Sequence, residues 1–328
     1  MSWLASKTPW GKLKKLGVVG LNQRNAEFIM NYNERRIYPL VDNKITTKKL
    51  AVERGIPVPE LYGHIRLEHQ SRQLKTLLDQ HQQFVIKPAR GSGGNGIMVI
   101  TGKTSNGQFR KANDNLISLS DIKHHISNVL SGMYSLAGDT DSAIIEYCVQ
   151  FDPCFQTVSY KGVPDIRLIV FRGIPLFAMV RLPTRQSDGR ANLHQGAVGA
   201  GIDLISGLTR GAVMQSQPVN THPDTGASLE GLQIPQWQEI LLLGSKCYDI
   251  APLGYLGVDI VLDKDRGPLM LELNARPGLA IQIANAQGLG PILEYAKKLG
   301  TVPESAEKRV KLGQTINHKF QPQQQHHE

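Results

Sequence analysis

The chain has little cysteine. It contains three cysteines in 328 residues, Cys148, Cys154 and Cys247, and none of them is in a CxxC spacing. This odd, sparse number excludes a disulfide framework and is typical of a reducing compartment. We expect each cysteine to be a buried small apolar residue.

The sequence also lacks long apolar runs. No stretch approaches the ~18 apolar residues of a membrane span, and the N-terminus, MSWLASKTPWGKLKKLG, lacks the apolar core of a signal peptide. Aromatic residues make up 6% of the chain and form no aromatic and basic stripe of the kind that stacks on bases. We expect a soluble, cytoplasmic protein without a membrane span or a nucleic-acid partner.

What the chain has is apolar bulk and basic charge. Apolar residues make up 41% and charged residues 20%, enough for one large domain or two to three lobes. The formal net charge of +9 favours nucleic acid, an anionic membrane surface, or phosphate and carboxylate substrates. Much of the excess lies in two end segments, where a charge run usually forms a solvated face: Lys12, Lys14, Lys15, Lys297, Lys298, Lys308, Arg309, Lys311 and Lys319.

The stretch Gly254–Gly278 predicts a β-hairpin. Within it, Gly257–Leu262 and Leu269–Leu273 alternate apolar and polar residues, and the intervening DKDRGP has the composition of a turn.

This hairpin predicts a cation site. If Leu262 and Leu269 are partners, Asp259 lies opposite Glu272, and Asn274 shares its face because strand side chains repeat every two residues. Two opposed carboxylates repel, so we expect a cation between them. Three hard oxygen donors suit Mg²⁺ held partly by phosphate. The alternative is a solvated hairpin with chance acids.

A glycine-rich loop lies between two predicted strands in the segment 83–100. Its string Gly91-x-Gly93-x-x-Gly96 matches a dinucleotide fingerprint, but that motif requires a following helix, and Ile97–Ile100 is strand-like. Such a loop can close over phosphates with its backbone N–H groups, and Lys87 can add a charge. The alternative is a flexible hairpin with a surface lysine.

Two strands carry further candidates. The predicted strand 143–149 ends in Glu146-Tyr147, where backbone groups could bind an adenine edge and Glu146 could accept from a purine amine or a ribose. On the predicted strand that starts at Asp165, Arg167 either forms a surface ion pair with that aspartate or is aimed at a substrate anion.

These segments, in this order, resemble the ATP-grasp ligases, and most closely the α-L-glutamate-ligase-like branch related to the enzyme that adds glutamates to a ribosomal protein. The resemblance covers about residues 42–290. It rests on Lys44 before a helix ending in GIPVP, Lys87-Pro with the glycine loop, Ile-Glu146-Tyr147, Asp165-Ile-Arg167, Asn192-Leu-His194-x-Gly196, Gly257-Val-Asp259 and Leu-Glu272-Leu-Asn274-Ala-Arg276-Pro-Gly.

The resemblance implies an α+β ATP-grasp fold, in which two lobes hold ATP between antiparallel sheets. The expected organisation is a short N-terminal segment at 1–40, in place of the family's usual substrate domain, and an N-lobe with the glycine loop at 41–150. A C-lobe with the metal and substrate site follows at 151–300, and a polar, disordered tail at 301–328.

The resemblance also implies roles for individual residues. Lys44 and Lys87 would contact the phosphates. The loop that closes over them would consist of Gly91, Ser92, Gly93, Gly94 and Gly96. Adenine would be bound by Glu146, Tyr147 and Val149. Two Mg²⁺ ions, or Mn²⁺, would be bound by Asp259, Glu272 and Asn274. The acid substrate and the transferred phosphoryl group would be bound by Arg167, Arg190, Asn192 and His194. Arg276 stands where glutamate ligases more often carry a small residue and would add positive charge near the γ-phosphate.

The implied activity is an ADP-forming carboxylate–amine ligase that acts through an acyl phosphate. Its partners would be ATP, a carboxylate and an amine, with glutamate indicated by resemblance alone. The short N-terminal segment leaves open a large amine substrate, a partner protein or a homo-oligomer. The alternatives are an ATP-grasp phosphotransferase that acts on a hydroxyl, and a non-catalytic basic binding protein.

Overall fold

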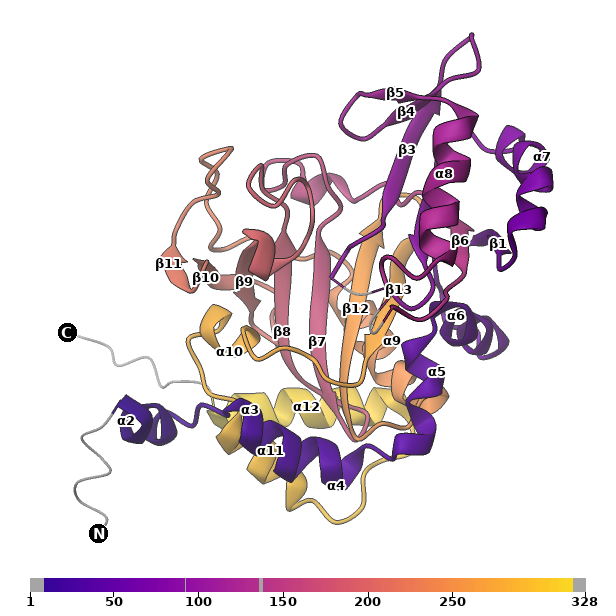
Figure 1. Cartoon of the computed structure of the whole chain (residues 1–328). Helices are drawn as coiled ribbons and strands as arrows, with labels where there is room; N and C mark the ends of the chain where they lie inside the picture. The colour runs from indigo at the N-terminus through magenta and orange to yellow at the C-terminus, as the bar shows by residue number, and fades with distance from the viewer. Residues whose placement is uncertain (1–8, 92, 136–137, 321–328) are drawn as a thin grey trace.

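The computed structural model describes residues 9–91, 93–135 and 138–320, and it has the expected α+β architecture of two antiparallel sheets flanked by helices (Figure 1). One sheet belongs to the N-lobe and the other to the C-lobe. The two lobes are joined through the segment that follows β6 and through the helix α6.

The N-lobe sheet has the strand order β1-β6-β2-β3-β4-β5. Helices α7 and α8 pack on it, and α8 buries Ile122, Ile126 and Val129, which recur at helical spacing. Ser118 caps α8 by accepting from the Asp121 N–H. The bounds are β1 Leu61–Ile65, β2 Phe84–Pro88, β3 Met98–Lys103, β4 Phe109–Lys111, β5 Leu116–Ile117, β6 Ala143–Glu146, η3 Glu68–Gln73, α7 Leu74–Asp79 and α8 Leu119–Leu130.

The C-lobe sheet has the order β11-β10-β9-β8-β7-β12-β13, with every neighbouring pair antiparallel. The bounds are β7 Asp165–Phe171, β8 Ile174–Leu182, β9 Val198–Ile202, β10 Thr209–Met214, β11 Gln217–Val219, β12 Tyr255–Asp263 and β13 Gly267–Asn274. The short helices η5, Pro153–Phe155, and η6, Leu193–Gln195, lie in its connections.

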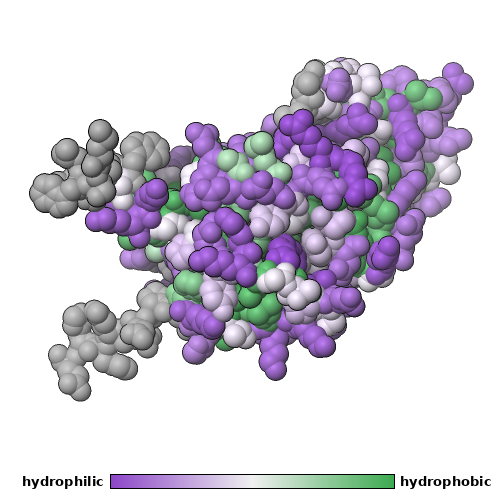
Figure 2. Space-filling view, turned by 90° about the horizontal axis from the view of Figure 1, so that it is seen from below, coloured by the Kyte–Doolittle hydropathy of each residue, from purple (hydrophilic) through white to green (hydrophobic). Residues whose placement is uncertain are grey.

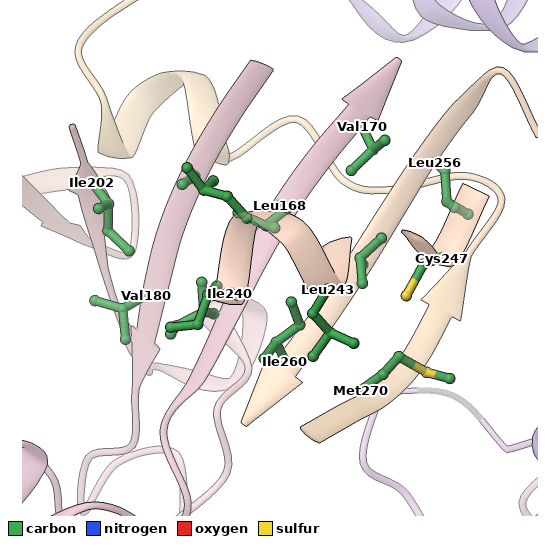
Figure 3. Close-up of a cluster of buried hydrophobic side chains, with 14 of the residues drawn as sticks. Leu168, Val170, Val180, Ile202, Ile240, Leu243, Cys247, Leu256, Ile260 and Met270 are labelled. Atoms are coloured by element: carbon green, nitrogen blue, oxygen red, sulfur yellow. The ribbon is translucent and has the colours of Figure 1, made fainter. Parts of the chain in front are cut away.

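Both faces of the central C-lobe strands are covered. On β7, Leu168 and Val170 face the helix α9, Trp237–Ile250, together with Ile260 of β12 (Figure 3). The alternate residue Phe171 joins a second core on the other side of the sheet. This explains why these strands are apolar along their whole length.

Two of the three cysteines fit the expectation of buried apolar residues. Cys247 packs in the core around α9 (Figure 3), and Cys148 is also buried. Cys154 is only half-buried.

The N-terminal segment packs on the C-lobe. Phe28 and Ile29 belong to the second core, beside Phe171 and Tyr255. The helical bounds in this part of the chain are α2 Pro9–Lys15, α3 Leu21–Gln23, the π-helical turn η1 Arg24–Ile29, α4 Met30–Tyr32, η2 Arg35–Ile37, α5 Pro39–Asp42 and α6 Lys44–Glu53.

Helix α6 contacts apolar residues of both lobes. Ala51 lies in the C-lobe core around α9, whereas Ile45 packs against Ala89 and Ile144 of the N-lobe. The expected N-lobe, 41–150, therefore begins with a helix that the two lobes share.

The C-terminal segment is helical, and the expected disorder from residue 301 is wrong for 306–320. Residues Ala306–Phe320 form α12, which follows α10, Ile281–Ala284, and α11, Gly290–Lys297. The spacing of Val310, Gly313 and Ile316 places them on one buried helix face. A polar composition concealed this stripe. Residues 321–328 lie outside the described part of the chain.

Candidate active site

The hairpin of β12 and β13 places Asp259 directly opposite Glu272, as the sequence predicted. The residues next to the turn pair differently from the prediction. Leu262 lies opposite Pro268 and not opposite Leu269, an offset of one residue. A β-bulge at Leu271 restores the register.

The bulge also reverses the alternation along β13. Met270 and Leu273 both face the core around α9, while Glu272 and Asn274 lie on the opposite face with Asp259. Figure 3 shows Met270 at the edge of that core.

Asp259 is buried between two arginines. Its carboxylate accepts from Arg167 Nε at 2.7 Å and Nη2 at 2.5 Å, and from Arg181 Nη2 at 2.6 Å. Burial alone would raise the pKa of Asp259, but the two guanidinium groups outweigh it and hold this pKa well below its usual range.

Asp165 completes a buried network of four charges. It accepts from Arg181, not from Arg167, so the expected Asp165–Arg167 surface ion pair is wrong in both partner and exposure. Side chains two residues apart share a face of β7, but Arg181 lies directly across from Asp165 on β8. Burial raises the pKa of Asp165 to about 7, against the opposing charge of Arg181.

Lys44 connects three elements of the site. Asn43 caps α6 by accepting from the Ile45 N–H at 3.0 Å, which makes Lys44 the first residue of the helix. The ammonium of Lys44 donates to the Gly91 carbonyl at 2.7 Å and lies 3.5 Å from Glu272 Oε2. Lys44, Lys48 and Glu272 line one small cavity.

Lys87 and Lys48 share one buried carboxylate. Glu146 Oε1 lies 2.5 Å from Lys87 Nζ, and Glu146 Oε2 lies 2.8 Å from Lys48 Nζ. Both oxygens of Glu146 thus face lysines, and the expected contact of this side chain with a purine amine or a ribose stays a prediction. Burial, together with the neighbouring Lys87, lowers the pKa of Lys48 to about 8, although Glu146 opposes this.

The glycine-rich loop reaches the C-lobe. The carbonyl of Gly93 accepts from Asn192 Nδ2 at 3.1 Å, and a Cβ built at Gly94 would lie 3.7 Å from Arg190 Cδ. Gly93, Gly94 and Gly96 have φ angles of +66°, +79° and +74°, a region that favours glycine. Ser92, predicted as part of the loop, lies outside the described residues.

The loop between β8 and β9 presents the predicted acid-binding residues. Asn192 caps η6 by accepting from the His194 N–H at 3.0 Å. Arg190 and His194 are exposed, and the guanidinium of Arg190 reaches only Gln195 Oε1, at 3.4 Å, among the interactions of the described chain. The guanidinium of Arg190 and the imidazole of His194 are therefore both open to a ligand.

The segment after β6 links the lobes. Tyr147 N–H donates to the Glu60 carbonyl at 2.8 Å, and Gln150 N–H donates to Asp263 Oδ2 at 2.9 Å. Burial and Asp263 raise the pKa of Tyr147 to about 12. Val149 is half-buried between these anchors.

Arg276 lies just beyond β13. Its N–H donates to Asn274 Oδ1 at 2.9 Å, and its exposed guanidinium lies 5.1 Å from the ring centre of Tyr38. No ion pair of Arg276 occurs within the described chain. The structure therefore brings Lys44, Gly91 and Glu272 together, and joins Arg276 to Asn274.

The oxygen donors on the hairpin fit a hard cation held in part by phosphate. Across residues 9–91, 93–135 and 138–320, no group of three or more His, Cys, Asp or Glu side chains gathers as a metal centre. Asp259 and Glu272 lie opposite each other, with the amide of Asn274 on the same face, so protein alone would supply too few donors for Mg²⁺.

Lys48 and Arg181 are site residues without a predicted role. Lys48 had a signal in the sequence, since it follows Lys44 by four residues and shares its helix face. Arg181 had a weaker one: it is one of three arginines between residues 181 and 190, and nothing nearby in the sequence marks its place on β8 opposite Asp165.

The chain belongs to the sugar-transfer associated ATP-grasp family, whose sequence profile it matches over residues 23–298. No match was found among curated protein sequences. The closer resemblance to α-L-glutamate ligases stays a prediction.

Several solved structures are similar to this one. The ATP-grasp ligase PsnB with its minimal precursor has 15% identity and a TM-score of 0.44, over 80% of this chain and 62% of that one. The D-cycloserine synthetase DcsG has 12% identity and a TM-score of 0.41, over 85% and 71%. The D-alanine–D-alanine ligase from Coxiella burnetii has 13% identity and a TM-score of 0.42, over 87% and 60%. The chain thus spans less than two thirds of PsnB and of the Coxiella enzyme.

No helix among the described residues is long and apolar enough to cross a membrane.

Proposed function

We propose that this protein is an ATP-dependent, ADP-forming ligase that joins a carboxylate to an amine through an acyl phosphate. The observation that carries the proposal is the position of Lys44. Its ammonium contacts both the glycine-rich loop at Gly91 and the carboxylate of Glu272, and so brings a cation, a loop carbonyl and an acidic group to one place between the lobes.

The nucleotide would lie between the two sheets. Lys44 and Lys87 supply positive charge for its phosphates, and the loop from Gly91 to Gly96 supplies backbone N–H groups. Backbone groups of the segment from Glu146 to Val149 would bind adenine, since the Glu146 side chain is held by lysines.

Asp259, Glu272 and Asn274 would hold the metal. Two Mg²⁺ ions, or Mn²⁺, would neutralise the phosphate charge that develops during transfer. Three of the lone pairs on Asp259 already face Arg167 and Arg181, whereas the partly exposed Glu272 has only Lys44 at 3.5 Å among its described ion pairs. Glu272 is therefore the central ligand of the set.

The reaction would take two steps. A carboxylate oxygen attacks the γ-phosphorus of ATP, and ADP leaves with the electrons of the broken P–O bond. The amine nitrogen then attacks the acyl carbon, phosphate leaves, and the nitrogen loses a proton.

The protein's part in both steps is positioning and charge. Arg167, Arg190, Asn192 and His194 would orient the acid and the transferred phosphoryl group, and Arg276 would stabilise negative charge beside Asn274. The contact between Gly93 and Asn192 ties the loop to this region, and closure of the loop over bound ligands would exclude water, which would hydrolyse an acyl phosphate.

The carboxylate substrate would be a small acid or a peptide, and the amine would be an amino acid or a peptide. Glutamate is the first amine to test. A partner protein or a second copy of the chain would supply part of the acceptor surface.

One experiment tests the activity directly. Purified protein is incubated with ATP, Mg²⁺ and a panel of amino acids and acidic peptides, and the products are read by mass spectrometry. Hydroxylamine should trap the acyl phosphate as a hydroxamate. A phosphate ester in its place would identify a phosphotransferase, and no nucleotide turnover with any acid would contradict the proposal.

A further inference from the structure

The N-terminal segment carries a surface that the proposed ligase chemistry does not use. Among the exposed large apolar side chains of the described residues, four occur in this short stretch of chain: Leu13, Leu16, Leu21 and Met30, which are 41%, 69%, 62% and 74% exposed. Scattered single exposed leucines are ordinary, but four in one short segment are a feature of this part of the molecule.

The first part of this segment is basic and has no acid. Residues 9–26 contain Lys12, Lys14, Lys15 and Arg24, and the first acidic residue of the chain is Glu27. The three lysines are exposed, and none forms an ion pair with another described residue. We call Lys12, Lys14, Lys15, Leu13, Leu16 and Leu21 the basic–apolar patch.

Helix geometry places the two kinds of side chain together. The Leu16 N–H donates to the Lys12 carbonyl at 3.1 Å, so the helical turn continues past the end of α2. Leu13 and Leu16, three residues apart, then share one face. Lys12 and Lys15 border that face on one side, and Lys14 borders it on the other.

The patch is fixed to the body of the molecule. The Gly17 carbonyl accepts from the Gly290 N–H at 2.9 Å, and Val19 exchanges hydrogen bonds with the side chain of Gln282 at 2.8 and 3.0 Å. A Cβ at Gly17 would lie 2.4 Å from Pro291 Cδ, so the chain passes close to α11 at this point. The leucines directly before this anchor nevertheless point into solvent. Figure 1 shows α2 extending from the molecule, and Figure 2 shows hydrophobic residues among hydrophilic ones on the face seen from below.

We propose that the basic–apolar patch binds the surface of an anionic lipid bilayer and places the protein at a membrane interface without spanning it. Leucines bordered by lysines match the acyl and headgroup layers of such a surface. Both halves of the patch then have a partner, because lysines lie near anionic headgroups and leucines enter the acyl boundary.

Two other partners fit less well. A second copy of the chain docked patch to patch would bring three lysines from each copy together with no acid between them. A nucleic acid would attract the lysines but would leave Leu13, Leu16 and Leu21 in water.

The test measures co-sedimentation of the full chain with vesicles of phosphatidylcholine alone and of phosphatidylcholine mixed with phosphatidylserine. Binding should require the anionic lipid and weaken with salt. The apolar variant Leu13→Ser/Leu16→Ser and the charge variant Lys12→Gln/Lys14→Gln/Lys15→Gln should each lose at least about tenfold in partitioning. Matched controls are Leu67→Ser/Leu116→Ser and Lys49→Gln/Lys75→Gln/Lys246→Gln, which alter exposed residues elsewhere and should bind as the unaltered chain does.

Four results would overturn the proposal. They are no binding to either vesicle, equal loss in the control variants, tight binding to RNA without binding to vesicles, and a concentration-dependent dimer that the Leu13→Ser/Leu16→Ser variant abolishes. Thermal melts of all variants check folding. The result is independent of the ligase assay, so either proposal can fail alone.

Discussion

At the residue scale, two buried lysines share the one carboxylate of Glu146. Lys48 and Lys87 therefore leave one positive charge in excess beside the cavity that Lys44 and Glu272 line. An uncompensated cation in a protein interior is costly, and a phosphate group would balance it.

The pKa of Lys48 makes this excess measurable. Its ordinary pKa is 10.5, and burial lowers it to about 8, so between these values the unfolded chain holds a proton that the folded chain has lost. Stability rises with pH wherever the unfolded state binds more protons. The free energy of unfolding should therefore gain a contribution from pH 8 towards 10.5 that the variant Lys48→Met lacks.

Urea denaturation of both proteins across this pH range measures the difference. Lys49→Met alters the exposed neighbour on α6 and should retain the pH dependence of the unaltered chain. Parallel pH profiles for the Lys48→Met and unaltered proteins would contradict a depressed pKa.

Glu272 is the second residue to test. Glu272→Gln keeps the shape of the side chain but removes the charge opposite Asp259. ADP release should fall by at least about 100-fold, as expected when a charged group that stabilises the transition state is lost. The melting temperature should change little, because the Glu272 side chain is 33% exposed and its ion pair with Lys44, at 3.5 Å, is long and adds little stability.

ADP release is followed by a coupled assay, and Glu60→Gln, an exposed glutamate paired with Arg266, is the control. Full ADP release by Glu272→Gln would remove this residue from the metal set.

The residue scale also shows what a sequence can predict. The two-residue repeat and an assumed Leu262–Leu269 turn pair placed Asp259 opposite Glu272, and the structure keeps this pairing because the bulge at Leu271 offsets the one-residue shift at the turn. The partners of Asp165 and Glu146 could not be predicted, because Arg181 and Lys48 reach them from elements whose packing is not local. Strand period is encoded in neighbours, whereas an ion pair between elements depends on the whole fold.

At the scale of elements, α12 is the clearest addition to the predicted fold. Ile316 is 1% exposed and joins the second C-lobe core, while Thr315 beside it is exposed. A polar segment with five buried positions is helical here because the C-lobe supplies the surface against which it packs.

Ile316→Asp should therefore destabilise the protein by about 3 kcal/mol or more, since it buries a carboxyl group without a partner. Chemical denaturation measures the loss, and Thr315→Asp is the matched control. If 306–320 were disordered, the two substitutions would have equal and small effects.

The two predicted hairpins, by contrast, were both readable from local pattern. The strand–loop–strand at 83–100 and the hairpin in 254–278 carry alternating residues and turn composition. The bulge at Leu271 was not readable, because one extra residue leaves no mark in an apolar stretch.

At the scale of the whole molecule, the lobes are held by α6 and by the segment after β6. The sequence assigned α6 to one lobe, because a helix of ten residues does not reveal how many surfaces it contacts. A ligand bound between the lobes would add contacts to both.

ATP with Mg²⁺ should therefore stabilise the chain by mass action. At a ligand concentration of 100 times the Kd, the gain is about 2.7 kcal/mol, which thermal melts at rising ATP concentration would detect. Glu272→Gln should show a smaller shift with ATP and Mg²⁺, and CTP tests base selectivity. The absence of any shift at saturating ATP would contradict nucleotide binding between the lobes.

The anchoring of Gly17 beside Gly290 has one more consequence. Phe320 lies at the same place, because its carbonyl accepts from Gln287 Nε2 at 3.2 Å. Gly17, near the start of the described chain, and Phe320, at its end, thus both lie beside the segment 287–290 and are near in space although far apart in the sequence. A circular permutant that links these ends and opens at the exposed turn before Gly107 would cut no strand of either sheet, so the order of synthesis could be rearranged while the pairing of Asp259 with Glu272 is kept.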